Sequence, residues 1–321
     1  MRTLFLILSA ALFTTPVLAQ AWPDKPVRVI VGYPPGGGHD FVARLVAQRM
    51  ADTLKQSFVV ENRAGASGAI ATEFVAKSAP DGHTFIVASP AEVLVGPIAG
   101  QKVPYDPDKD LAPVAMIGET PLAVVVHPSV QAKTIQELIA LAKRSPGKFS
   151  YGTPGTGSSH QFAGEAMKAI AGVFIVHIPY RGAGPAVADL LGGQVEIGIA
   201  GMPPVIGHHK TGKLRILAVT SEKRLAATPD IPAMAELPGF KGYHFTNWQG
   251  IYVAARTPRP AIDALAAAIR AAVRDAEVSK KLVAAGVDPL GLNTAEFTAF
   301  LARERATYAK VAKDRSIRAD D

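Results

Sequence analysis

The chain has 321 residues, with 34 lysines and arginines against 27 aspartates and glutamates, a formal net charge of +7, and no cysteine. The absence of cysteine excludes disulfides, thiolate metal sites, cysteine catalysis and a lipid-modified cysteine. The basic residues are scattered, and no zinc-finger, basic-zipper or aromatic RNA-binding pattern occurs, so we expect no nucleic-acid partner. The excess positive charge instead favours anionic small molecules.

Residues 1–21 have the pattern of a cleavable secretory signal. Arg2 supplies a positive start, residues 4–12 form an apolar core, and residues 19–21 read Ala-Gln-Ala before Trp22. The apolar core is too short to span a bilayer, and no later stretch reaches the ~20 apolar residues that a spanning helix needs. We therefore expect the mature chain to leave the cytoplasm as a soluble protein.

The first glycine loop, residues 33–40, reads Tyr-Pro-Pro-Gly-Gly-Gly-His-Asp. An apolar run at 27–31 predicts a buried strand before it, and apolar residues at helical spacing over 41–50 predict a helix after it. The glycines let the backbone approach a ligand closely, and Asp40 is expected as an N-cap or first-turn residue. The free N–H groups at such a helix start suit an anion such as a carboxylate; a plain strand-to-helix turn is the alternative.

The next elements place a second strand end beside this loop. Strands are expected at 58–62 and 84–88, with a helix at about 69–78 between them. Ser89 and Pro90 follow the later strand directly. Because ligands in open α/β sheets bind at the carboxyl ends of strands, we expect these two residues to lie beside the first loop.

The chain is then expected to leave its first lobe. Residues 104–113 indicate a proline-rich connection with little regular structure, and a strand at 122–128 is expected to cross to a second lobe. A helix follows at 135–144. Thr134 is its expected N-cap, and Glu137 stands at the capping-box position.

The second glycine loop, residues 149–160, repeats the design of the first. A short strand leads into Gly-Thr-Pro-Gly-Thr-Gly-Ser-Ser-His, and a helix follows to about residue 171. We expect Ser158 or Ser159 to cap that helix, and both hydroxyls could donate to an anion. Two such loops predict two lobes that each direct a helix N-terminus at a shared cleft.

The remaining elements continue the alternation of strands and helices, which is typical of α/β proteins with largely parallel sheets. Strands are expected at 173–180, 195–200, 214–219 and 247–254, and helices at 185–192, from 201, at 259–275, 278–285 and 294–313. The strand at 247–254 is expected to return to the first lobe. Lobe 1 is thus expected at 22–125 and 248–321, and lobe 2 at 126–247.

Several short motifs occur in a specific order along the chain: Trp-Pro-x-Lys-Pro at 22–26, Tyr-Pro-Pro-Gly-Gly-Gly at 33–38, Val-Glu-Asn-Arg at 60–63, Pro-Asp-Gly at 80–82, Pro-Tyr-Asp at 104–106, Gly-x-Gly-Pro-Ala at 182–186 and Gly-Lys-Leu-Arg at 212–215. This order, over essentially the whole mature chain, resembles the Bug receptors, the periplasmic substrate-binding proteins of tripartite tricarboxylate transporters (TctC-like). The resemblance implies a two-lobed type II, or Venus flytrap, fold that closes on one small carboxylate. It further implies a monomer that delivers this ligand to membrane subunits, with no cofactor and no metal.

The resemblance also implies ligand contacts, made largely by backbone amides, hydroxyls and ordered waters. Carried over by position, those of lobe 1 are Tyr33, Pro35, Gly36, Gly37, Gly38, His39, Asp40, Ser89 and Pro90, and those of lobe 2 are Thr153, Gly155, Thr156, Gly157, Ser158, Ser159, His160, Tyr180 and Arg181. Tyr33, Tyr180 and Trp248 are of a kind that more often packs in a core than stacks on a ligand, but each is expected near a strand end, where a pocket would form. Arg181 is a surface cation or a charge partner for a dicarboxylate.

Three departures from the family pattern stand out. His39 occupies a position where the family usually has Thr or Ser, and the alternative to a ligand contact is a solvated first-turn histidine. Pro154 alters the second loop. Residues 200–202 read Ala-Gly-Met where many members have an Asp-Asn pair. We hypothesise that losing this carboxylate disfavours amino-acid ligands, whose ammonium group needs an acceptor.

A secreted hydrolase acting on a small carboxylic ester is the alternative from another class. No Gly-x-Ser-x-Gly elbow occurs, and Ser158 and His160 lie only two residues apart at a helix start, which is no nucleophile–base arrangement. Zinc, phosphate-loop and dinucleotide motifs are missing from the sequence as well. The sequence therefore favours a binding protein over an enzyme.

Overall fold

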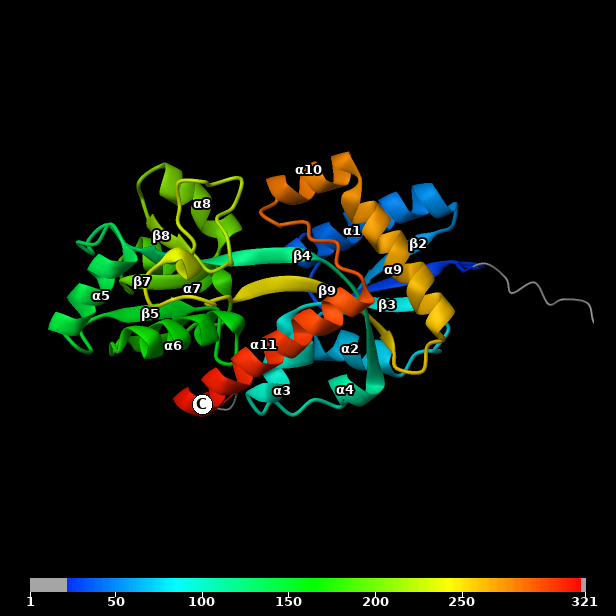
Figure 1. Cartoon of the computed structure of the whole chain (residues 1–321), viewed down its shortest axis with the longest axis horizontal. Coiled ribbons are helices and arrows are strands. Elements are labelled where there is room, and N and C mark those ends of the chain that lie inside the picture. Colours follow the sequence, from blue (N-terminus) through cyan, green and yellow to red (C-terminus); the bar gives the residue numbers. More distant parts are fainter. Residues whose placement is uncertain (1–21, 319–321) are drawn as a thin grey trace, which may run out of the picture.

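Two α/β lobes lie side by side and are joined by two long strands, β4 and β9 (Figure 1). The structure is a computed structural model, and it describes residues 22–318. The expected secretory signal, residues 1–21, lies outside the described residues. None of the helices within 22–318 is long and apolar enough to cross a membrane.

The sheet of lobe 1 has the strand order β2-β1-β3-β9-β4. Strands β1, β2 and β3 are mutually parallel, and β9 is antiparallel to both β3 and β4. Four of the five strands therefore run in one direction. Their bounds are β1 Val27–Val31, β2 Phe58–Asn62, β3 Thr84–Ala88, β9 Thr246–Ala254 and β4 Leu111–Val126, which continues into lobe 2.

Lobe 2 repeats this plan with the order β8-β4-β7-β5-β6. Strands β5, β6 and β7 are mutually parallel, and β4 is antiparallel to its two neighbours β7 and β8. The bounds are β5 Ser150–Thr153, β6 Val176–Pro179, β7 Ile197–Gly201 and β8 Arg215–Val219. The predicted two-lobed α/β class with mostly parallel sheets is confirmed.

Helices cover both faces of each sheet (Figure 1). On one face of lobe 1, Val29 packs with Val46 and Leu265, whereas its neighbour Ile30 packs on the other face with Val75. This burial on both faces explains the continuous apolar run of β1. The helices are α1 Gly38–Leu54, α2 Ala69–Ala76, α3 Gly96–Ile98, α4 Pro107–Asp110, α5 Ile135–Arg144, α6 Ser159–Ala171, α7 Ala183–Leu191, α8 Met202–Lys210, α9 Arg259–Arg274, α10 Ala276–Ala284 and α11 Thr294–Arg315.

Strand β4 belongs to both sheets. Residues 111–121 pair with β9, and residues 122–126 pair with β7 and β8. The prediction of an irregular connection up to residue 113 was wrong, because α4 and the first part of β4 occupy it. Prolines occur in this strand where a missing N–H is tolerated. Pro113 adjoins a register shift, and Pro121 ends the pairing with β9.

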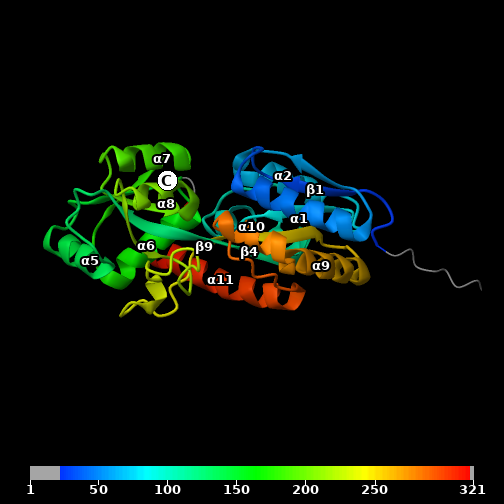
Figure 2. The same ribbon diagram turned by 90° about the horizontal axis from the view of Figure 1, so that it is seen from above.

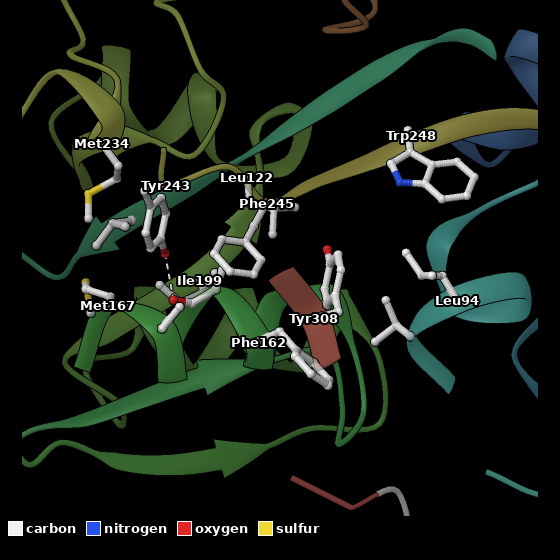
Figure 3. Close-up of a cluster of buried hydrophobic side chains, with 14 of the residues drawn as sticks. Leu94, Leu122, Phe162, Met167, Ile199, Met234, Tyr243, Phe245, Trp248 and Tyr308 are labelled. Carbon is white, nitrogen blue, oxygen red and sulfur yellow. Dashed lines mark hydrogen bonds between the residues drawn. The ribbon is translucent and has the colours of Figure 1, made fainter. Parts of the chain in front are cut away.

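Helix α11 crosses from lobe 1 to lobe 2 beside these strands (Figures 1 and 2). Its start is held to lobe 1 by the Thr294 hydroxyl, which donates to the Val114 carbonyl at 2.6 Å. Farther along, the ring of Tyr308 lies 5.1 Å from Phe162 of α6 and 5.4 Å from Phe245. Figure 3 shows Tyr308 inside the buried cluster that joins the lobes.

The strand directions make the carboxyl ends of the two sheets face each other. In lobe 1, β4 runs parallel to β1–β3 and leaves towards lobe 2, so β1–β3 end on the side of the junction. In lobe 2, β7 runs back along β4, with Gly201 opposite Leu122, and β5 and β6 are parallel to β7. Loops after these six strands are therefore directed at one junction.

Candidate binding site

Asp40 organises the first glycine loop. Its carboxylate accepts hydrogen bonds from the Gly36 N–H at 2.9 Å, from Arg44 Nε at 3.0 Å and from Asn62 Nδ2 at 2.9 Å. The bond from Arg44 is the main reason why the pKa of Asp40 falls to about 2. Asp40 lies in the first turn of α1, whose N-cap, Gly37, provides no side-chain cap. Asp40 thus links the loop to α1 and to the end of β2.

The glycines of this loop leave the start of α1 open. Gly36, Gly37 and Gly38 are exposed, and a Cβ atom added at Gly36 or Gly38 would meet nothing within 4 Å. Gly36 has a φ of +82°, which favours glycine. The start of this 17-residue helix therefore has no side-chain cap and lies beside exposed glycines, as an anion site requires.

Tyr33 and His39 form the wall beside these glycines. Their ring centroids lie 4.8 Å apart, and the Tyr33 hydroxyl lies 2.9 Å from Ser89 Oγ. His39 is 7% exposed, so it is no solvated first-turn residue, and its Nε2 has no hydrogen-bond partner within the described part of the chain. Burial lowers the pKa of His39 to about 4. The ring is therefore neutral near pH 7, and one buried nitrogen is unused.

Glu92 is a buried acid at this wall that the sequence reasoning did not include among the site residues. It follows Pro90 on a π-helical turn, Ala91–Val95, and Ser89 donates to it through both its backbone N–H, at 2.9 Å, and its hydroxyl. The side chain is 2% exposed. An acidic residue inside an apolar run directly after a strand end was the available signal.

The second glycine loop is held by its own helix start. Ser158 caps α6 by accepting from the Gln161 N–H at 3.3 Å, and its hydroxyl donates to the Gly155 carbonyl at 2.6 Å. The Gly157 N–H donates to Gln161 Oε1 at 2.7 Å. The predicted cap is thus Ser158, and Ser159 is buried behind it. With its proton directed at a carbonyl, Ser158 is not arranged as a nucleophile.

Two half-buried histidines, His160 and His177, lie at this loop. The Thr153 hydroxyl lies 2.7 Å from Nε2 of His177, a residue on β6 that the sequence reasoning did not select. Burial lowers the pKa of His160 and of His177 to about 4. Between residues 22 and 318, His160 Nδ1 finds no hydrogen-bond partner. Both rings are neutral near pH 7, so they add no positive charge to the loop.

Tyr180 and Arg181 stand at the end of β6. The Tyr180 hydroxyl donates to Asp189 at 2.8 Å, and its N–H donates to the Thr153 carbonyl at 2.9 Å, which ties it to the second loop. Arg181 is exposed and forms no ion pair within residues 22–318. It is therefore a cation that remains available at the junction.

The predicted residues thus form two groups, one in each lobe. Those of lobe 1 gather at the ends of β1 and β3, with Pro35 exposed and Pro90 buried, and those of lobe 2 gather at the ends of β5 and β6, with Thr156 half-buried in the loop. The two groups belong to facing sheet edges. The arrangement can hold an anion by backbone N–H groups and hydroxyls from two sides.

A charged network spans the junction between the lobes. His244 Nε2 lies 3.0 Å from Glu119 of β4, and its Nδ1 lies 3.3 Å from Glu304 of α11. Burial lowers the pKa of His244, but the hydrogen bonds to the two carboxylates outweigh it and raise the pKa to about 10. Thr246, the first residue of β9, also donates to Glu119 at 2.9 Å. This cluster ties both connecting strands to α11.

Two α/β lobes on a pair of shared strands, with strand ends and open helix starts facing one junction, define a two-lobed periplasmic binding protein. Residues 42–317 match the family described as "Tripartite tricarboxylate transporter family receptor". The chain belongs to this family, as its motifs predicted, and its class is that of a solute-binding receptor and not of an enzyme.

Relatives and solved structures agree over nearly the whole chain. It is 36% identical to Protein BugT of Bordetella pertussis over 310 residues, covering 96% of this chain and 95% of BugT. The R. palustris protein Rpa4515, solved with adipate, is 32% identical with a TM-score of 0.80, covering 92% of this chain and 99% of that one. MatC from Rhodopseudomonas palustris, solved with bound malate, is 28% identical with a TM-score of 0.73, covering 90% and 99%.

Proposed function

We propose that this receptor captures a small carboxylate between its lobes and delivers it to membrane subunits of a tripartite transporter. We further propose that it acts as a monomer and that its signal, residues 1–21, is removed on export to the periplasm. The observation that carries the proposal is the pair of glycine loops at facing sheet edges, of which the first leaves the start of α1 uncapped and open. Binding of adipate and malate by two solved relatives supports the same class of ligand.

The charges at the site favour an acid over an amine. Asp40 is already occupied by three donors, and His39 and His160 are neutral near pH 7. Arg181 is the free cation of the second group, and it is the proposed partner of one carboxylate. At 200–202 no carboxylate is present to accept an ammonium group, which disfavours amino acids. A hydrogen bond between a donor and an ionised carboxylate gains strength in a closed cleft.

The proposed movement is closure of one lobe on the other about β4 and β9. Strand β4 changes partners between residues 121 and 122, and β9 begins at Thr246, so both connections pass the junction at the same level. We propose that the lobes divide near residues 125 and 247, a few residues after this change of partners in β4, with lobe 1 made of 22–125 and 248–321 and lobe 2 of 126–247.

A thermal-shift and calorimetry panel on residues 22–321 tests this proposal. The acids are adipate, malate, citrate, benzoate and aspartate. A ligand at a hundred times its Kd adds about 2.7 kcal/mol to stability, so a rise in the melting temperature with at least one non-amino acid is expected. Arg181→Ala should weaken that ligand tenfold or more, whereas Arg144→Ala, on an exposed part of α5, should not. No shift with any acid, together with no acid released on denaturing the purified protein, would refute the proposal.

A further inference from the structure

Glu92 carries an unused oxygen in a buried place. Its Oε2 accepts both hydrogen bonds from Ser89, whereas Oε1 is buried and has no hydrogen-bond partner among the described residues. The residue lies on the π-helical turn after β3. Such turns are rare and occur frequently at functional sites. An unpaired carboxylate oxygen in this setting is costly unless the group takes up a proton.

Groups packed around Glu92 supply hydroxyls, and Glu92 forms no ion pair with any residue in 22–318. Tyr33 follows β1, and Tyr105 donates from its hydroxyl to the Glu92 carbonyl at 2.9 Å. Burial raises the pKa of Tyr33 and of Tyr252 on β9, and the nearby charge of Glu92 raises both further. Gly68, after β2, lies so close that an added Cβ would come within 2.5 Å of the Glu92 side chain. Burial raises the pKa of Glu92 to about 7, although the hydrogen bonds from Ser89 lower it.

Tyr33, Ser89 and Glu92 form one chain of hydrogen bonds whose direction depends on a single proton. When Glu92 is ionised, it accepts the Ser89 hydroxyl, and Ser89 Oγ accepts the Tyr33 hydroxyl, so both protons are directed inward. When Glu92 is protonated, it donates to Ser89, Ser89 donates to Tyr33, and the Tyr33 proton is free for the cleft. Tyr33 is the outer, half-buried member of the chain.

We propose that Glu92 is a positioning residue that sets the direction of the Tyr33 and Ser89 hydroxyls, and that the capture of a carboxylate is coupled to the uptake of one proton at Glu92. This inference rests on the proposed function, because it concerns the same site. The proton comes from solvent and remains on Glu92, and no covalent bond to the ligand forms. When Glu92 is protonated, the Tyr33 hydroxyl can donate to the bound carboxylate. When Glu92 is ionised, the Tyr33 oxygen presents only lone pairs to it.

The coupling is tested by calorimetry with adipate and malate at pH 6, 7 and 8, in phosphate and in Tris, whose ionisation enthalpies differ. For the wild type, Kd should rise about tenfold from pH 6 to pH 8, with nearly one proton taken up at pH 8. Glu92→Gln keeps an acceptor for the Ser89 N–H and a donor for the Ser89 oxygen. Its Kd should match that of the wild type at pH 6 and stay constant up to pH 8, without proton uptake.

Glu73→Gln, on the neighbouring helix α2, makes the same change of charge outside the Tyr33–Ser89–Glu92 hydrogen bonds. It should keep the wild-type dependence of Kd on pH. Tyr33→Phe should weaken binding at pH 6 and remove the slope. A wild-type Kd that is constant from pH 6 to pH 8, or a slope that persists in Glu92→Gln, would overturn the inference.

A ligand-free measurement separates this inference from the proposed function. Because folding raises the pKa of Glu92, the stability that it contributes below its usual pKa is lost as the pH rises through about 7. The melting temperature of the wild type should therefore fall relative to Glu92→Gln between pH 6 and pH 8. An unchanged difference would refute protonation of Glu92 itself. Binding of no acid at any pH would instead refute the proposed function, and the coupling with it.

Discussion

Replacing Asp40 by asparagine should loosen the first glycine loop. Asparagine keeps one acceptor oxygen but loses the charge that holds Arg44 and the second acceptor that serves Asn62. The fall of the Asp40 pKa from 3.8 to about 2 corresponds to about 2 kcal/mol of stability. Since Arg44 is about half exposed, solvent screening reduces the expected loss to about 1–2 kcal/mol.

Urea denaturation at several pH values measures this loss. The pKa of Asp40 is lowered by folding, so its contribution is present above about pH 4 and is lost as the pH falls towards 2. Asp40→Asn should thus cost the same at pH 6 and pH 8 and less below pH 4. Asp52→Asn, at the exposed end of the same helix, should cost less than 0.5 kcal/mol. Equal effects of the two substitutions would refute the reasoning.

Two further predictions concern the junction. Tyr308→Ala removes a fully buried ring between Phe162 and Phe245 and should cost about 3–5 kcal/mol in urea denaturation; a loss below 1 kcal/mol would show that α11 does not hold the lobes together. His244→Gln leaves two carboxylates without their cation and should cost about 3 kcal/mol at pH 6. Because folding raises the pKa of His244, this cost should shrink from pH 6.5 to pH 10; a cost that does not depend on pH would contradict the charged network.

Local signals in the sequence predicted most elements of the fold. The helix at 135–144 was expected from its apolar spacing and from Thr134, and the structure places α5 there with the Thr134 hydroxyl accepting from the Glu137 N–H. Strands β2 and β3 have their predicted bounds. These elements depend on periodicity and caps within a few residues, which the sequence displays directly.

Elements that depend on distant partners were harder to predict. The first half of β4 reads as a proline-rich connection, and only pairing with β9, more than 120 residues later, makes it a strand. The π-helical turn after β3 has no periodic signal of its own. In the first half of β4, tertiary pairing thus outweighs local propensity.

The candidate site divides in the same way. Both glycine loops were visible because strand, loop and helix follow one another along the chain. The partners that shape them come from other elements: Asn62 reaches Asp40 from β2, and His177 reaches Thr153 from β6. No spacing in the sequence links such pairs, so His177 appeared only when β5 and β6 were placed side by side, whereas Glu92, three residues after Ser89, had a local signal that the prediction did not use.

The order of strands in lobe 1 has a consequence for the way the protein matures. Strand β9 lies between β3 and β4, with Ala88 opposite Gly250, so the sheet lacks an inner strand until the chain has been completed beyond residue 254. Lobe 2 takes β5–β8 from one continuous segment and can assemble first. A chain that ends before residue 246 would keep β3 and β4 as open edges, which invite aggregation. The last part of the polypeptide therefore determines when the first part becomes stable.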